Sequence, residues 1–584
     1  MNMTFSFLAG VIPILFIKTD HENCRKCYAC VRACPVKTIA IKKGLPEIIE
    51  EGCLTCGRCV LACSIGAKVV QDDTTMVQQW IAEGQSVAAI VAPSFPASFA
   101  VSGGKMVSAL QRLGFSTVQE VAYGAGICAK EYANYYRQNP DKMTISTACP
   151  AVVQLVEKHF PSLLPHLAPI DSPMLIQSKI VKSMYPDHKI VFIGPCLAKK
   201  HEAADANTAG YVDAVITFRQ LNQWFVQENI NCQEMPDALW DNPKPELSRT
   251  FPISGGLLKS SNIQEDIASM EIIVVEGAGR CIEVLKAVEN GEFTPRFLDM
   301  LICEGCVMGP GMLSDKCYVV RARQVAEQID QNQNIADDKL PEIINELTFE
   351  RVFTPQPLVK RTFSDEEIWQ TLKETGKHSQ RDLINCSACG YDTCWEKAVA
   401  CLQGMAEKEM CLPFLLRQVP SLTNSLMDMS NKLMLSMESI NFSTLTLKGT
   451  TNKMNIKNRQ LETLLAETNA IASDTLALAN KVLTMVSEYQ DSTKGQGENT
   501  KISAADMAEI KQIAAQSKLQ SENATRVFQD IASVLTRLKE DSDMILEQER
   551  AIKVVTNSLE QIVATYDQLL NIGAAMANIG RNYT

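Results

Sequence analysis

Two short cysteine runs decide the fold of the first part of the chain: CRKCYACVRACP at residues 24–35 and CLTCGRCVLACS at residues 53–64. Each run has the spacing C-x2-C-x2-C-x3-C, and together they hold eight of the 21 cysteines. The positions are Cys24, Cys27, Cys30, Cys34, Cys53, Cys56, Cys59 and Cys63. Such tight spacing wraps backbone N–H groups around a bound cluster, where these donors tune its reduction potential.

This spacing is typical of two-cluster ferredoxins, in which the fourth cysteine of each run ligates the cluster of the other run. One 4Fe–4S cluster is therefore expected on Cys24, Cys27, Cys30 and Cys63, and a second on Cys53, Cys56, Cys59 and Cys34. Zinc sites and disulfides are the alternatives. Disulfides are disfavoured in a reducing cytosol, and zinc ribbons rarely repeat this spacing, so iron–sulfur binding is the favoured interpretation.

The bulk properties exclude some function classes. The 584 residues suffice for three or four domains, and a net charge of -11 argues against a nucleic-acid partner. The apolar run at residues 5–17 is too short to span a bilayer. A secretory signal requires a basic residue before its apolar run, and no Lys or Arg precedes this one. ILFIKTD at residues 14–20 is predicted as a β-strand. We expect a cytoplasmic protein without a membrane role; residues 1–12 receive no function, and contact with a membrane surface is the lesser alternative for them.

A third cysteine set lies in INCSACGYDTCWEKAVACLQGMAEKEMC, residues 384–411. Cys386, Cys389, Cys394 and Cys411 follow the spacing C-x2-C-x4-C-x16-C, with the first three on a predicted loop and the fourth after a predicted helix at residues 395–410. The set resembles a small 4Fe–4S module of redox and corrinoid-handling proteins, and a zinc knuckle is the alternative. Cys401 falls inside the helix and is expected to be a core residue.

Four more cysteines follow strand-like runs. Cys149 lies in TACP after MTIS, Cys196 in GPCLAKKHE after KIVFI, and Cys303 and Cys306 in LICEGCVMGPG. Loops after parallel strands meet at the carboxyl edge of an α/β sheet, where binding sites collect. Three loops meeting there could deliver four thiolates to one cluster, although spacing alone does not establish this.

The segments STACPAVVQ, GPCLAKKHE and LICEGCVMGPG resemble the signature motifs TSCCP, MPCxxKxxE and MAC…GC of the FeFe hydrogenases. APSFPASF, LQRLGFSTVQEVAYGAG and FPISGG occupy matching positions, and the resemblance extends from the first cysteine run to about residue 360. It implies an H-cluster, in which a 4Fe–4S cubane is joined through one thiolate to a diiron centre that carries CO, cyanide and an azadithiolate bridge.

The resemblance also implies residue roles. Cys149, Cys196 and Cys303 would bind the cubane, and Cys306 would bridge to the diiron centre. Lys199 matches the lysine that pairs with one cyanide, and Pro93 and Ser94 match the segment near the other. Glu202 and Ser172 match polar residues of the proton path, and Glu131 matches one more weakly.

The departures from the family motifs concern proton transfer first. Ala148 replaces the thiol that passes protons to the azadithiolate amine. Losing such a group costs on the order of 100- to 10,000-fold in rate, roughly 3–5 kcal/mol. Cys128 or Glu131 could supply another route, although Cys128 is more readily read as a packing residue. Other departures are Gly194, Leu301 and Val152 in place of Met, Met and Trp, the shortened CEGC, and GPGM in place of a glycine-rich ending.

The composition changes after about Leu412: Pro413 and Pro420 are the only prolines, and there is no cysteine or tryptophan. Steps of 3 and 4 connect Leu464 to Met485 and Ile510 to Leu538, with later members Ile545, Ile552, Val555, Leu559 and Ile562. This periodicity is typical of coiled coils. STKGQGENT is predicted as a break between two long helices, which would pack antiparallel within one chain and then pair with a second chain. EIKQIAAQSKLQSENATRVFQDIASVL resembles cytoplasmic helices of methyl-accepting chemotaxis proteins; a plain dimerisation stalk and a signalling arm remain equal interpretations.

The predicted architecture is multidomain. It comprises a ferredoxin-like α+β domain (1–75), an α/β H-cluster domain (76–360), a 4Fe–4S module (361–412) and a helical coiled-coil tail (413–584). We expect an anaerobic sensory hydrogenase that acts on H2 and protons with low turnover and forms a homodimer that contacts a signalling partner. A catalytic hydrogenase that uses a soluble ferredoxin, and a non-enzymatic iron–sulfur carrier, are the alternatives. Cys232, Cys281 and Cys317 are expected to be core or surface thiols.

Overall fold

The computed structural model describes residues 16–264, 268–330, 334, 340–358, 361–446, 451–493 and 504–540, and single positions between 554 and 568. The interpretations of residues 1–12 and of the seam positions from Ile545 to Ile562 lie outside the described residues. Two compact units are present. The first comprises Met1–Asp20, Cys34–Thr38 and Ile48–Lys360, and the second His21–Ala33, Ile39–Glu47 and Arg361–Thr584. The predicted 1–75 segment therefore contributes to both units.

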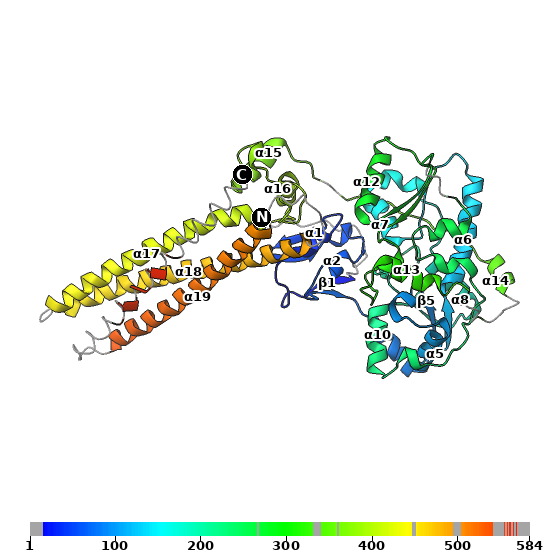
Figure 1. Cartoon of the computed structure of the whole chain (residues 1–584), viewed down its shortest axis with the longest axis horizontal. Helices are drawn as coiled ribbons and strands as arrows, with labels where there is room; N and C mark the ends of the chain where they lie inside the picture. Colours follow the sequence, from blue (N-terminus) through cyan, green and yellow to red (C-terminus); the bar gives the residue numbers. More distant parts are fainter. Residues whose placement is uncertain are drawn as a thin grey trace. The chain divides into compact units, whose positions relative to one another are not determined.

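The first unit is built around two parallel sheets. The larger has the strand order β6-β5-β8-β9, with β5 Val87–Val91, β6 Thr117–Glu120, β8 Lys189–Gly194 and β9 Ala214–Thr217 (Figure 1). The smaller has the order β10-β11-β7, with β10 Ile272–Glu276, β11 Phe297–Leu301 and β7 Thr144–Ile145. All five residues of β5 are buried, as expected for a parallel strand covered on both faces.

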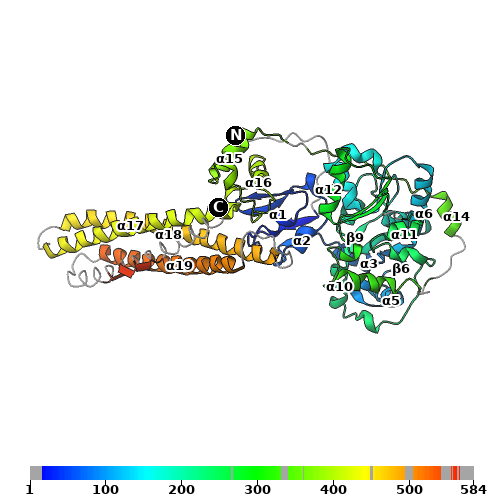
Figure 2. The ribbon, with the colours of Figure 1, turned by 45° about the horizontal axis from the view of Figure 1, so that its top comes forward.

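Helices connect and cover these strands. Those around the larger sheet are α3 Thr74–Ala82, α4 Pro96–Phe99, α5 Gly103–Leu113, α6 Val121–Gln138, α8 Pro173–Met184, α9 Ala198–Ala204 and α10 Phe218–Gln227 (Figure 2). The others are α7 Pro150–His159, α11 Gly256–Ser261, α12 Ala278–Glu289, α13 Tyr318–Ala326 and α14 Leu340–Glu346. Each sheet has its own hydrophobic core, one containing β5 and β8 and the other containing β11 and α7.

The first unit also includes part of the cysteine-rich segment. Strand β1, Ile17–Thr19, pairs antiparallel with β4, Lys68–Val70, and α2 spans Arg58–Leu61. The strand predicted at residues 14–20 thus has its described part at Ile17–Thr19. Leu54 and Cys56 pack into the core of the smaller sheet.

The second unit begins its C-terminal part at Arg361, at the start of the predicted 4Fe–4S module. Its elements are α1 Ala29–Ala33, the hairpin β2 Ile39–Lys42 and β3 Leu45–Ile48, α15 Asp365–Glu374, α16 Cys394–Leu402, α17 Leu412–Thr446, α18 Thr451–Thr493 and α19 Ala504–Glu540. The hairpin turn docks on the module because the Lys43 and Gly44 amides donate to the Glu407 carboxylate at 2.5 and 2.8 Å.

The tail contains three described helices where two were predicted, because α17 precedes the first seam. Leu412, Leu415 and Leu416, at the start of α17, pack with Val482 and Met485, near the end of α18. Helices α17 and α18 are therefore antiparallel, and Ile510 at the start of α19 joins the same cluster. Along both predicted seams most described positions are buried, including Thr468, Thr475, Ser517 and Gln520. We call α17–α19 the three-helix bundle. Among the helices of the described residues, none combines the length and the apolar character needed to cross a membrane.

Candidate functional site

Strand ends bring four cysteines of the first unit to one place. Cys149 follows β7 and caps α7, Cys196 follows β8, and Cys303 and Cys306 follow β11. All four line one cavity of about 390 Å³, together with Cys56. Gly305 allows the tight turn between the last two cysteines, since its φ is +71° and an added Cβ would lie 3.0 Å from the Pro252 carbonyl oxygen.

The electrostatics of these thiols suit a bound cationic metal centre. Burial, with a smaller contribution from the nearby Cys149, raises the pKa of Cys196 to about 11. Burial likewise raises the pKa of Cys149, whereas hydrogen bonds to its sulfur from the backbone N–H groups of Ile302, Val152 and Ala151 act to lower it. Four thiolates this close repel one another unless metal ions neutralise them. The donor set therefore fits an iron–sulfur cubane, which would be held by Cys149, Cys196, Cys303 and Cys306.

A second, larger cavity adjoins the first, since Cys196 and Cys306 line both. It contains about 720 Å³ of empty space, including the part open to solvent. Its wall includes Pro93, Ser94, Ala148, Lys199 and Asp299, with apolar side chains around them. The Ser94 hydroxyl is fully buried and has no hydrogen-bond partner among the described residues. Because an unpaired buried hydroxyl is costly, this wall fits a polar ligand such as a cyanide on a diiron centre.

Lys199 reaches the cavity from α9 and is held by two acceptors. Its Nζ donates to Glu202 Oε2 at 2.6 Å and to Ser172 Oγ at 2.8 Å. Ser172 also caps α8 and donates to the same carboxylate at 3.0 Å. The predicted residues Lys199, Glu202 and Ser172 thus form one buried cluster.

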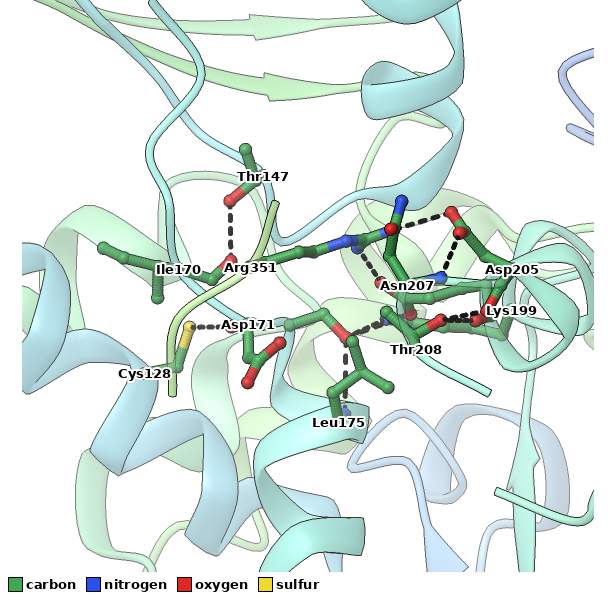
Figure 3. A network of polar contacts seen from close by, with 12 residues as sticks. Cys128, Thr147, Ile170, Asp171, Leu175, Lys199, Asp205, Asn207, Thr208 and Arg351 are labelled. Carbon is green, nitrogen blue, oxygen red and sulfur yellow. Dashed lines mark hydrogen bonds and ion pairs between the residues drawn. The ribbon is translucent and has the colours of Figure 1, made fainter. Parts of the chain in front are cut away.

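Arg351 completes this network and was not anticipated from the sequence (Figure 3). Its Nη1 donates to Glu202 Oε1, and its Nη2 lies 3.7 Å from Asp205 Oδ2. Burial raises the pKa of Glu202, but Lys199 and Arg351 outweigh burial and lower the pKa below its ordinary value. Glu202 is therefore held ionised. No local motif marks Arg351, which lies 149 residues from its partner.

The other candidate proton carriers lie beside this network. Cys128 is fully buried, its thiol donates to the Asp171 carbonyl oxygen at 3.5 Å, and burial raises its pKa. Glu131 is partly exposed on α6 and affects Cys128 only through its charge. Its neighbour Tyr132, not singled out from the sequence, is fully buried, and its hydroxyl pairs with Thr147 Oγ1 at 2.8 Å.

The ferredoxin-type cysteines of the first unit gather across the two runs. Cys34 from the first run lies close enough to Cys53, Cys56 and Cys59 to raise the pKa of each, after the larger effect of burial. The Thr55 amide donates to Cys53 Sγ at 3.3 Å, and the Thr38 amide donates to Cys34 Sγ at 3.4 Å. This grouping has the membership predicted for the second cluster.

The remaining cysteines divide between the units. Cys24, Cys27 and Cys30 lie in the second unit and Cys63 in the first, so their common cluster stays a prediction. Cys386, Cys389, Cys394 and Cys411 line one cavity of about 470 Å³ in the second unit, and Cys401 is absent from its lining. Cys281 is buried, Cys232 is partly buried, and Cys317 is exposed. Within the described residues, no three Cys, His, Asp or Glu side chains converge tightly enough to bind a single metal ion.

Comparison with known proteins gives family matches for two parts of the chain. Residues 85–310 match the family described as the C-terminal domain of the iron only hydrogenase large subunit, and residues 16–64 match the 4Fe–4S dicluster domain. The chain is 26% identical over 362 residues to the periplasmic Fe hydrogenase large subunit of Nitratidesulfovibrio vulgaris, covering 51% of this chain and 86% of that protein.

Other relatives are matched over smaller shares of their length. Iron hydrogenase 1 of Clostridium pasteurianum is 28% identical over 282 residues, which cover 40% of this chain and 49% of that protein. The cytosolic Fe–S cluster assembly factor NAR1 of Kluyveromyces lactis is 29% identical over 144 residues, which cover 22% of this chain and 31% of that protein. A solved structure of a Chlamydomonas reinhardtii FeFe-hydrogenase variant aligns with a TM-score of 0.42 at 16% identity, covering 49% of this chain and 100% of that one.

These matches coincide with the cavity of four cysteines and with the first cysteine-rich segment. Residues 85–310 are similar to the C-terminal domain of the iron-only hydrogenase large subunit and residues 16–64 to the 4Fe–4S dicluster domain, so over these parts the chain is a hydrogenase-like iron–sulfur protein homologous to the FeFe hydrogenases.

Proposed function

We propose that the chain is a sensory FeFe hydrogenase of the cytoplasm, which binds or slowly oxidises H2 and passes its redox state to the three-helix bundle. The observation that carries this proposal is Ala148 in the wall of the larger cavity. In the motif that STACPAVVQ resembles, this position holds the thiol that exchanges protons with the azadithiolate amine. A methyl group there can neither donate nor accept a proton.

The H-cluster, when bound, supplies the chemistry that splits or forms H2. The chain's own residues hold and enclose it: Lys199 offers an ammonium, Ser94 offers an unpaired hydroxyl, and apolar side chains limit access of water to the cavity. Glu202 is a poor substitute for the missing relay, because two cations hold it ionised. A relay must take up and release a proton with comparable ease. Turnover is accordingly slow while ligand binding is retained.

Cys56 supports a redox connection to the H-cluster. It belongs to the ferredoxin-type group with Cys34, Cys53 and Cys59, and it also lines the cavity of Cys149, Cys196, Cys303 and Cys306. A cluster on the ferredoxin-type group would therefore adjoin the H-cluster cubane directly. A second ferredoxin-type cluster and a cluster on Cys386, Cys389, Cys394 and Cys411 complete the proposed set.

The bundle is the proposed output, acting as a homodimer that contacts a signalling partner. Its interior carries buried hydroxyls and amides: Thr468, Thr475, Ser517 and Gln520 are all less than a tenth exposed. Such seams are less stable than all-aliphatic ones, which suits a bundle that shifts between packings.

Two other functions have specific support. Similarity to hydrogenases named as enzymes favours a catalytic protein that exchanges electrons with a soluble ferredoxin. Similarity to the NAR1 assembly factor favours a non-enzymatic iron–sulfur carrier. Retention of Lys199 and of the large cavity beside the cubane site weighs against the carrier.

Anaerobic infrared spectroscopy on matured protein tests the proposal, followed by H2-uptake assays on the same sample. CO and cyanide bands that shift under H2, with slow turnover, are expected. The variant Ala148→Cys should raise turnover by roughly 100- to 10,000-fold, whereas Ala148→Ser should raise it less, because a hydroxyl is a weaker acid. Fast turnover of the unaltered chain would establish the catalytic function. Absence of CO and cyanide bands at full iron loading would establish the carrier.

A further inference from the structure

The cavity of Cys386, Cys389, Cys394 and Cys411 also contains two buried lysines. Lys377, from the loop after α15, is 3% exposed, and Lys397, on α16, is 4% exposed. Both side chains line the same space of about 470 Å³ as the cysteines. Lysines are almost never buried to this degree unless they are paired.

The backbone of this site repeats a feature of the ferredoxin-type loop in the first unit. Thr55 and Gly57, on either side of Cys56, both have positive φ, at +51° and +73°. Asn385 and Ser387, on either side of Cys386, have φ of +51° and +57°. Positive φ is uncommon for residues other than glycine, and alternation of this kind turns successive N–H groups toward one concave space that favours anions.

The amides reach the cysteine sulfurs in the same register at both sites. In the ferredoxin-type loop, the Thr55 amide donates to the sulfur of Cys53, two residues earlier. In the C-terminal module, the Ala388 amide donates to the Cys386 sulfur and the Tyr391 amide to the Cys389 sulfur, again two residues earlier. N–H donors to cysteine sulfur are a means of tuning iron–sulfur clusters.

The two lysines present their charge to this site in different ways. Lys377 Nζ donates to Cys411 Sγ at 3.2 Å and to Thr375 Oγ1 at 3.0 Å. Lys397 Nζ hydrogen-bonds the side chain of Cys401, which does not line the cavity, and it lies near enough to Cys389 to favour the ionised form of that thiol. A neutral thiol does not balance the charge of a buried ammonium, so Lys397 is positioned for an anion that occupies the cavity.

The bundle holds one of these lysines in place. Arg417 on α17 donates to the carbonyl oxygens of Thr375 and Gly376 at 2.8 and 2.9 Å, and so braces the turn that precedes Lys377. Gly376 has φ of +70°, and an added Cβ would lie 2.9 Å from the Arg417 guanidinium carbon. Cys411 itself is followed directly by α17.

We propose that Lys377 and Lys397 are the counter-charges of a 4Fe–4S cluster on these four cysteines, and that they raise its reduction potential above that of the same site without them. The inference rests on the cluster set proposed above, but not on hydrogen sensing. A cubane with four thiolates is an anion and gains one further negative charge on one-electron reduction. Two fixed ammonium groups in a cavity of low dielectric therefore favour the reduced state. The lysines thus make this cluster easier to reduce, beside the first turn of the bundle.

Redox titration of the full chain, reconstituted anaerobically with iron and sulfide and without the diiron unit, tests the proposal. Cys386→Ser identifies the paramagnetic resonance signal of this cluster by removing it. Lys397→Gln should make its reduction at least tenfold less favourable, a shift of about 59 mV to more negative potential for a one-electron couple. Lys377→Gln should shift it the same way. Lys397→Arg keeps the charge and should stay near the unaltered value, as should Lys408→Gln, which removes an exposed lysine of the same module.

Each result is decisive. An unchanged midpoint in both glutamine variants, with the cluster present, overturns the proposal. So does a Cys386→Ser variant with the same iron content and signals as the unaltered chain, because no cluster is then bound. If Lys397→Gln prevents loading, retention of the cluster by Lys397→Arg supports a charge requirement, and loss in both contradicts it. Missing CO and cyanide bands in matured protein refute hydrogen sensing alone and leave these potentials unaffected.

Discussion

Replacing Arg351 by methionine removes one cation from the buried Glu202 network while keeping much of the side-chain volume. Arg351 is 5% exposed and Glu202 is fully buried, so solvent screens their interaction little. A hydrogen bond to a charged group contributes about 1.5–3 kcal/mol, and an orphaned buried charge costs about 3–5 kcal/mol. Glu202 keeps Lys199 and Ser172 as partners. We therefore expect a loss of about 2–3 kcal/mol in local stability.

Hydrogen exchange under native, anaerobic conditions measures this loss without requiring reversible unfolding of a multidomain protein. Because every 1.4 kcal/mol is a factor of ten, opening of α9 and of residues 349–358 should become roughly 30- to 150-fold more frequent. Arg323→Met is the matched control, because Arg323 pairs with Glu327 at 2.9 Å on the surface. Exposed pairs of this kind contribute about 0.2–1 kcal/mol.

Two results would refute this reasoning. Exchange of α9 in Arg351→Met within threefold of the unaltered chain would mean that Arg351 does not stabilise Glu202. Equal acceleration by Arg323→Met would mean that removal of positive charge in general, and not the buried pair, is responsible. The double variant with Glu202→Gln should lose less than the sum of the single variants, since both changes remove the same interaction.

Three further predictions concern the first unit. Burial lowers the pKa of His201 to about 4. The folded state therefore resists protonation of this imidazole, and the stability of the protein should fall as pH drops from the ordinary pKa of 6.5 toward 4. His201→Asn should flatten this pH dependence of the melting temperature in thermal-shift assays. Gly57→Ala places a Cβ 2.5 Å from Pro310 Cγ at a φ of +73°, so the variant should retain less iron after gel filtration. Gly66→Ala is the control for backbone strain alone, because Gly66 has a φ of +69° and no atom lies within 4 Å of an added Cβ. Ser94→Ala removes an unpaired hydroxyl, so the melting temperature of the unmatured chain should stay unchanged or rise. In matured protein the same variant should shift a cyanide band in the infrared spectrum. Unshifted bands would exclude contact between Ser94 and that cyanide.

Much of the fold and of the candidate site could be predicted from residues that lie near one another in the chain. The spacing of the two cysteine runs predicts iron–sulfur binding because neighbouring thiols on a short loop reach the same cluster wherever the loop lies. Cys149, Cys196 and Cys303 could be placed at strand ends because strand-like runs precede them, and the structure gathers them in one cavity with Cys306. Ala148 could be recognised as a departure from a relay motif because the surrounding residues match.

What the sequence by itself determined was therefore local: the cysteine spacings, the order of the motifs and the 3–4 periodicity of the tail. The tertiary structure alone decided which distant groups meet. It brings Arg351 to Glu202, places Cys56 beside the hydrogenase-type cysteines, and buries Lys397 in the cavity of the C-terminal cysteines. It also adds α17 to the bundle. Local spacing constrains only the residues that share one turn or loop, whereas burial and long-range pairing depend on how separate elements pack, and no short pattern records that packing.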